Sequence, residues 1–123
     1  MMSRHESLAE AIEAVDKVLR RSLMGVYLAL NTIAKVRYGT SFAELLFRDP
    51  AKAVELVREY AVGDEDSLTF IMRAALSALT DDRDVLDEII RAMKNRNYLR
   101  MHELLLKVAS LPIYRVSPRD IPR

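Results

Sequence analysis

The chain has 123 residues and a formal net charge of +1, with half of its residues hydrophobic, three glycines, four prolines and no cysteine. This length is typical of one domain, and folding at this size buries roughly two thirds of the unfolded chain's surface. The lack of cysteine excludes a disulfide framework, a thiolate nucleophile and a cysteine-ligated metal, and it favours a cytoplasmic protein. Arginine outnumbers lysine, which is compatible with a GC-rich genome or with a thermophilic source.

A long amphipathic helix is predicted from Leu8 to Tyr38, because apolar residues recur there at helical spacing with acids and bases between them. Its most apolar part, residues 23–34, is well short of the roughly 20 residues that span a bilayer, so we expect no membrane role. A straight helix of this span would be about 46 Å long, against a diameter of about 35 Å for the domain. We therefore expect it either to bend, at Gly25 and Asn31, or to project toward another subunit.

Start and stop signals divide the following part of the chain. Gly39 is placed to end the first helix, and Ser41 to cap a short one over residues 41–47. Asp49 is a good N-cap, Pro50 suits the first helical position, and Gly63 can adopt a left-handed conformation after the last turn. Further helices are predicted over residues 67–79, 80–95 and 96–111.

These signals predict an all-α fold. We expect residues 1–111 to form a single domain, a compact bundle of five to six helices that begins with the long helix. Residues 112–123, which hold three of the prolines, are predicted to form an extended C-terminal tail.

The C-terminal third is basic, since residues 91–123 carry eight bases and only two acids. A basic face suits nucleic acid, because each cation that meets a phosphate adds to affinity. Helical spacing, however, places Glu103 where it can pair with Arg100 and Lys107 on a solvated outer face, which we favour. The alternative is polyanion binding, and its candidate contacts are Arg91, Lys94, Arg96, Arg100, Lys107, Arg115, Arg119 and Arg123.

No pattern of catalytic or metal-binding residues is complete. His102 and Glu103 begin like the zinc-protease motif H-E-x-x-H, but Leu106 occupies the position of the second histidine. The acids at 64–66 and 81–88 stand where helices are expected to begin and lack the ligand spacing of an EF-hand, so we interpret them as caps. We expect no enzyme activity, no metal site and no cofactor.

Apolar residues are more numerous in two segments than a small bundle easily buries. They lie in residues 23–36 and in residues 67–79, where Arg73 is the only charge. Either the monomer core covers them, or a second copy or another protein does, which would remove apolar surface from water. The candidate interface residues are Leu23, Val26, Tyr27, Leu30, Phe70 and Ala74.

The segments "AVDKVLRRSL", "VYLAL" and "FAELLFRDPAKAVELVREYAVGDEDSLTFIMRAAL", within residues 14–79, resemble the Nitrosopumilus output domain, a family of small archaeal helical domains. The resemblance lies in a long helix, a short one and two capped ones. It implies a non-catalytic module that occurs alone or attached to signalling proteins. Our leading hypothesis is accordingly an interaction or regulatory domain that acts as a homodimer or binds another protein, and the alternative is a nucleic-acid-binding accessory protein.

Overall fold

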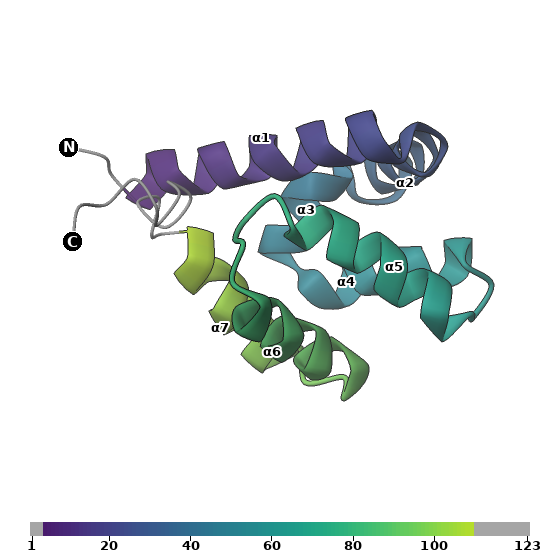
Figure 1. The fold of residues 1–123 in the computed structure, drawn as a ribbon. Coiled ribbons are helices and arrows are strands. Elements are labelled where there is room, and N and C mark those ends of the chain that lie inside the picture. Colours follow the sequence, from purple (N-terminus) through teal and green to yellow (C-terminus); the bar gives the residue numbers. More distant parts are fainter. Residues whose placement is uncertain (1–3, 110–123) are drawn as a thin grey trace, which may run out of the picture.

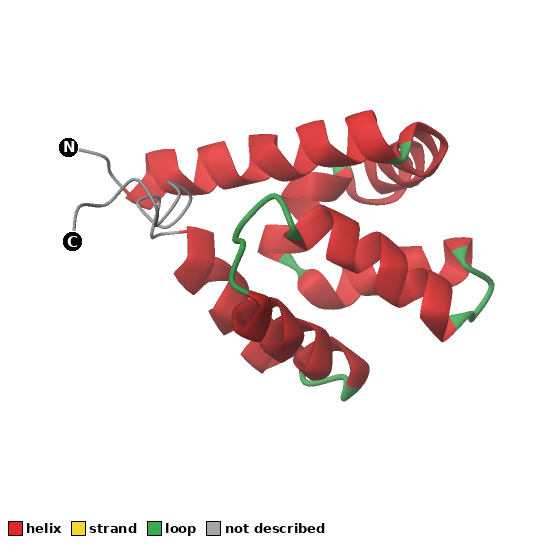
Figure 2. Ribbon diagram, in the orientation of Figure 1, coloured by secondary structure: helices red, strands yellow, loops and turns green. Residues whose placement is uncertain are grey.

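The computed structural model describes residues 4–109, and all the elements in this range are helices (Figures 1 and 2). Figure 2 shows them joined by short loops, with no strand in this range. The helices are α1 (Arg4–Ser22), α2 (Met24–Tyr38), α3 (Phe42–Arg48), α4 (Pro50–Tyr60), α5 (Glu65–Leu76), α6 (Arg83–Lys94) and α7 (Tyr98–Ala109). The all-α prediction is confirmed. The end of the predicted domain at 110–111 and the tail at 112–123 lie outside the described residues.

The predicted long helix is two helices, which is why the described bundle has one helix more than the largest number expected. The break falls at Leu23 (φ −139°, ψ 60°), two residues before Gly25, and α2 folds back to pack against α1. Figure 1 shows α2 at the far end of α1, turned away from its direction. Folding back lets both helices contribute to one core, which a straight rod longer than the domain could not do.

Asn31 was the second expected bend point, and it serves another purpose. It lies inside α2, where its Oδ1 accepts a hydrogen bond of 2.9 Å from the backbone N–H of Phe42. That N–H belongs to the first turn of α3 and has no partner within its own helix. Asn31 therefore fixes the start of α3 against α2.

The helix ends predicted at Gly39, Ser41 and Asp49 are confirmed, whereas the helix predicted over residues 67–79 is α5, which ends at Leu76. Gly39 follows α2 in a left-handed conformation (φ 70°). The side chains of Ser41 and Asp49 accept from the backbone N–H groups of Glu44 (3.1 Å) and Lys52 (3.3 Å), which caps α3 and α4. Each cap of this type contributes about 1 kcal/mol.

The core is shared by all seven helices. α1 packs on α2, α3, α5 and α7, while α4 packs on α2, α3, α5 and α7. The face that α1 presents to the core is the predicted apolar stripe, with Ala11, Val15 and Leu19 at most 1% exposed. The largest fully buried side chains are Phe42, Phe47, Leu19, Leu30, Leu46, Leu56, Leu68, Met72, Leu76, Leu79, Ile89 and Met93.

His102 joins α7 to α3. Its Nε2 lies 2.7 Å from the carbonyl oxygen of Phe47, so the ring N–H donates to that carbonyl. Phe47 stands in the last turn of α3, where carbonyl groups lack partners because the chain turns at Asp49 before α4 begins. The histidine that begins the incomplete zinc motif is thus a structural hydrogen-bond donor.

Candidate docking surface

An open groove of about 510 Å³ lies where the start of α2 and the end of α4 meet the first half of α5. Leu23 and Val26 form one wall, and Phe70 and Ile71 form the other. In Figure 1 the α1–α2 junction and the α4–α5 turn lie at the same end of the molecule. The full lining is Leu23, Val26, Tyr60, Ala61, Asp66, Ser67, Phe70 and Ile71.

The side of α2 that faces away from the core is apolar as well. Met24 is 52% exposed, Leu28 55% and Val36 80%. With the exposed Thr32 these residues are spaced four apart, so they form one stripe along the helix. We call Met24, Leu28, Thr32 and Val36 the outer face of α2.

The outer face and the groove belong to one surface. Ala29 and Ile33, both half-buried, lie between the groove side of α2 and its outer face on the helical wheel. No charged residue occurs in α2 before Lys35. The surface therefore continues from Phe70, across the groove and around α2, and its α2 side carries no charge before Lys35.

The fold brings together three of the six predicted interface residues. Leu23, Val26 and Phe70 all line the groove, and Phe70 is 63% exposed. Ala74 is half-buried one turn further along α5. Leu30, in contrast, is fully buried within the chain's own core, so it offers no surface to a partner.

Tyr27 is held by its own chain. Its hydroxyl donates to a carboxylate oxygen of Asp16 over 3.3 Å, and the guanidinium of Arg20 lies 5.9 Å from the centre of its ring. These contacts fasten the first turn of α2 to the end of α1. Tyr27 thus fixes the angle between α1 and α2, and it stands at the edge of the candidate surface.

Ion pairs fix the frame around the groove. Arg37 at the end of α2 makes two hydrogen-bonding contacts with Glu59 of α4, of 2.9 Å and 3.2 Å. This pairing lowers the pKa of Glu59 and raises the pKa of Arg37, chiefly through the hydrogen bond between them. Arg58 pairs with Glu65 across the α4–α5 turn. The first pair ties α2 to α4, and the second ties α4 to α5, which carries the other wall.

The α4–α5 turn holds a strained apolar residue next to the groove. Gly63 has the predicted left-handed conformation (φ 79°), but Val62 before it is also left-handed (φ 54°) and is 89% exposed. The backbone bonds from Gly63 to Arg58 and from Val62 to Glu59 form a Schellman motif with valine at the left-handed position. A β-branched residue rarely adopts this conformation. No contact within the described residues explains why valine occupies position 62.

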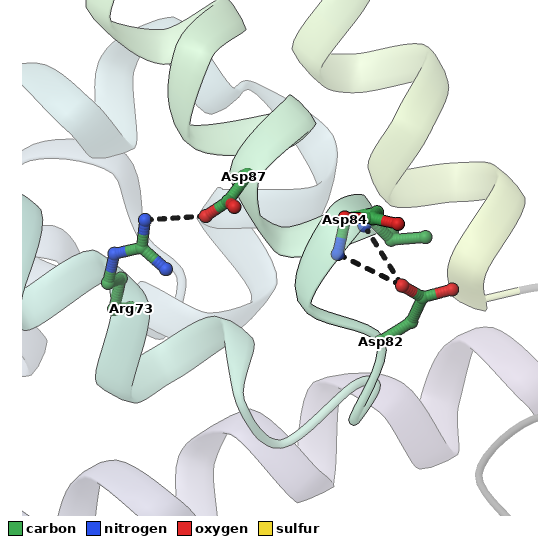
Figure 3. Close-up of polar contacts among 5 residues, drawn as sticks. Arg73, Asp82, Asp84 and Asp87 are labelled. Carbon is green, nitrogen blue, oxygen red and sulfur yellow. Dashed lines mark hydrogen bonds and ion pairs between the residues drawn. The ribbon is translucent and has the colours of Figure 1, made fainter.

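One acid in each of the two predicted clusters, Asp64 and Asp82, caps a helix. Asp64 accepts from the backbone N–H of Asp66 (3.3 Å) and from the hydroxyl of Ser67 (2.6 Å). Asp82 accepts from the N–H groups of Asp84 (3.0 Å) and Val85 (3.4 Å), as Figure 3 shows. No group of three or more histidine or acidic side chains within residues 4–109 is arranged to hold a metal ion.

Arg73 of α5 and Asp87 of α6 form the ion pair at the other side of Figure 3, with 2.7 Å between Nη2 and Oδ1. This hydrogen bond lowers the pKa of Asp87, and the positive charges of Arg73, Arg83 and Arg91 lower it further. The only charge in the apolar α5 segment is therefore used to join α5 to α6.

The predicted polyanion contacts within the described range lie on α6, on α7 and in the turn between them. Arg100 is placed 2.6 Å from Glu88 and 3.8 Å from Glu103, so an acid neutralises it on each side. Lys94 and Arg96 at the α6–α7 turn have no ion-pair partner within residues 4–109. Arg115, Arg119 and Arg123 lie outside the described residues.

Several apolar side chains in or beside this surface were not among the predicted interface residues, and the most exposed of them are Met24, Leu28, Val36 and Val62. The four-residue spacing of the first three is a signal that the sequence contains. Val62 carries no such signal. The sequence predicted a left-handed residue only at Gly63, and the exposure of Val62 follows from its own left-handed conformation in that turn.

Comparison with known proteins gave no match to a family model, to a curated protein or to a solved structure. The resemblance of residues 14–79 to the Nitrosopumilus output domain therefore stays a prediction. No helix within residues 4–109 has the length and apolar character needed to cross a membrane.

Proposed function

We propose that this protein is a non-catalytic protein-binding domain, and that the groove together with the outer face of α2 is its docking surface. One observation carries the proposal: α2 has no charge over its first eleven residues, yet Leu30 and Ala34 are its only buried residues. A helix that is apolar on all sides is expected in a core or under a partner. The chain itself covers one side of α2, so a partner is required for the rest.

The neighbouring side chains support the same surface. Phe70 projects from α5 with 63% of its surface exposed, and Tyr60 beside it is 40% exposed. Aromatic side chains at the centre of a concave apolar patch are the usual anchors of a protein interface. The ion pairs around the groove hold its walls in place, so little ordering is needed on binding.

Photo-crosslinking tests the proposal directly. A photoreactive phenylalanine derivative is placed at position 70 of the full chain, which is then irradiated in a soluble extract of the source organism and, separately, as the purified protein. The matched control carries the same group at Leu99, which is 73% exposed on α7. We expect a discrete protein adduct at position 70 in at least one sample and none at position 99. Equal labelling at both positions, or no protein adduct at position 70, would overturn the proposal.

A further inference from the structure

We infer that the partner on this surface is an amphipathic helix of another protein, and that this helix places a lysine or arginine beside Asp66. The inference rests on the proposed function and adds the chemistry of the occupant. Two observations carry it. The groove lies between two helices, and the one charge in its lining is a carboxylate that has no ion-pair partner among residues 4–109.

The groove lies where a further helix can pack. α2 and α5 each pack on α1 and on α4, but they do not pack closely on each other. Leu23 and Val26 therefore face Phe70 and Ile71 across an open space. A groove bounded by two apolar helix surfaces accepts the apolar face of an amphipathic helix.

A helix suits these walls better than an extended segment does. Both walls belong to helices, whose backbone N–H and C=O groups beyond the end turns are bonded within the helix. The walls offer no sheet edge to which a strand could add, so contact is made through side chains alone. An occupant that is itself a helix satisfies its own backbone groups in the same way, and it presents apolar side chains on one face.

Asp66 sets the charge of the occupant. It is the only charged residue in the groove lining within the described part of the chain, and residues 61–67 contain three acids and no base. Of the other two acids, Glu65 is paired with Arg58 and Asp64 caps α5. The carboxylate of Asp66 makes no ion pair within residues 4–109. This end of the groove is therefore negatively charged.

A partner that covers this carboxylate without a counter-charge binds poorly. Filling the groove removes Asp66 from water, and a buried carboxylate is tolerated only when it is paired or hydrogen-bonded. A lysine or arginine on the occupant supplies that pair, and Asp66 repels any partner that presents an acid at this point. Asp66 stands one helical turn before Phe70. In an occupant that lies along α5, the cation therefore stands three or four residues from the side chain that contacts Phe70.

Selection from a displayed library of helices tests the inference on the full 123-residue chain. Each member has about 18 residues, long enough to be helical, with leucine, phenylalanine or alanine on one face and lysine, glutamate or glutamine at random elsewhere. Helices bound by the wild type should carry lysine three or four residues from an apolar anchor about tenfold more often than glutamate. The chain's net charge of +1 gives no general preference for lysine. Asp66→Lys should reverse the preference.

Asp84→Lys is the matched control, because Asp84 is also an exposed acid at the second position of a helix but does not line the groove. Both substitutions place a cation in a first turn, so a loss of helix stability affects both variants alike. Asp84→Lys should select the same helices as the wild type does.

The inference is overturned if no helix is enriched, if Asp66→Lys leaves the charge preference unchanged, or if Asp84→Lys alters it equally. None of these results removes the proposed function. An adduct at position 70 with a second copy of the chain, or with a segment that carries no cation, would retain the docking surface and assign it another occupant.

Discussion

Helices α2, of 15 residues, and α6, of 12, relate to the core in opposite ways. α6 buries Ile89, Ile90, Ala92 and Met93, and its charges lie outside this stripe, where one of them bonds to α5. α2 is more apolar, yet it buries only Leu30 and Ala34. The sequence of α6 is accounted for by folding of the monomer. The excess of apolar residues in α2 over what the fold buries is the observation that carries the proposed docking surface.

The largest expected effect is a difference in stability between a buried substitution in α6 and an exposed one in α2. Ile89→Ala should lower the free energy of unfolding by about 2–5 kcal/mol, because it leaves a cavity at a fully buried site. Leu28→Ala removes a similar side chain from the outer face of α2 and should change it by no more than about 0.5 kcal/mol. Urea denaturation at low micromolar protein measures both. A loss at Leu28 as large as that at Ile89 would mean that the outer face of α2 is covered within the chain.

The second effect concerns the side chain that caps the start of α6. Asp82→Ala removes the side chain that accepts from Asp84 and Val85, and should destabilise the protein by about 1 kcal/mol. Asp82→Asn keeps an accepting oxygen and should retain most of that stability. Asp81→Ala, one residue earlier and exposed, is the control for lost charge alone. Equal losses at 81 and 82 would show that charge near the helix start, not the cap, stabilises α6.

Local features of the fold could be predicted from the sequence because they depend on few neighbouring residues. The caps at Ser41, Asp49 and Asp64, and the left-handed glycines at 39 and 63, each need only a side chain and the next turn of backbone. The predicted pairing of Glu103 with Arg100 on an outer face was likewise correct, with 3.8 Å between their charged atoms, because helical periodicity fixes which residues are neighbours.

Features that depend on distant parts of the chain were not predictable in the same way. The break at Leu23 has no cap and no glycine at the break itself, and it is set by how α1 and α2 share one core. The groove requires Leu23 and Phe70 to meet, and periodicity within either helix does not place them together. Leu30 was predicted to face a partner for the same reason: without α1 and α3 in place, nothing distinguishes its side of α2 from the side of Leu28.

A smaller effect of opposite sign is expected at Gly25. In dilute protein, where the monomer prevails, Gly25→Ala should raise the free energy of unfolding by about 0.4–1 kcal/mol, since alanine restricts the unfolded chain and meets no atom in the fold. A loss of monomer stability in urea denaturation would contradict this expectation and show that the chain itself needs glycine there.

The smallest effect is electrostatic and belongs to α6. Because Arg73 lowers the pKa of Asp87 in the folded state, the unfolded chain binds a proton at this carboxylate more readily. The stabilisation is therefore complete above the ordinary aspartate pKa of about 3.9 and is lost as pH falls through the lower folded value. The difference in unfolding free energy between the wild type and Asp87→Asn should be largest near pH 7 and should fall toward zero as the pH drops below about 4. In 1 M salt this difference should also become smaller, because the ion pair is exposed.

If the difference in unfolding free energy between the wild type and Asp87→Asn did not change with pH, Asp87 would contribute through packing and not through its charge.

The pH dependence also sharpens the comparison between α6 and α2. Charges on α6 that pair within the chain should appear in the pH dependence of stability, which does not vary with protein concentration. Exposed apolar side chains on the outer face of α2, such as Leu28, should instead affect partner binding, which does vary with concentration. If substitutions on α6 changed association, and those on α2 changed only the stability of the monomer, the docking surface would lie on α6 and not on α2.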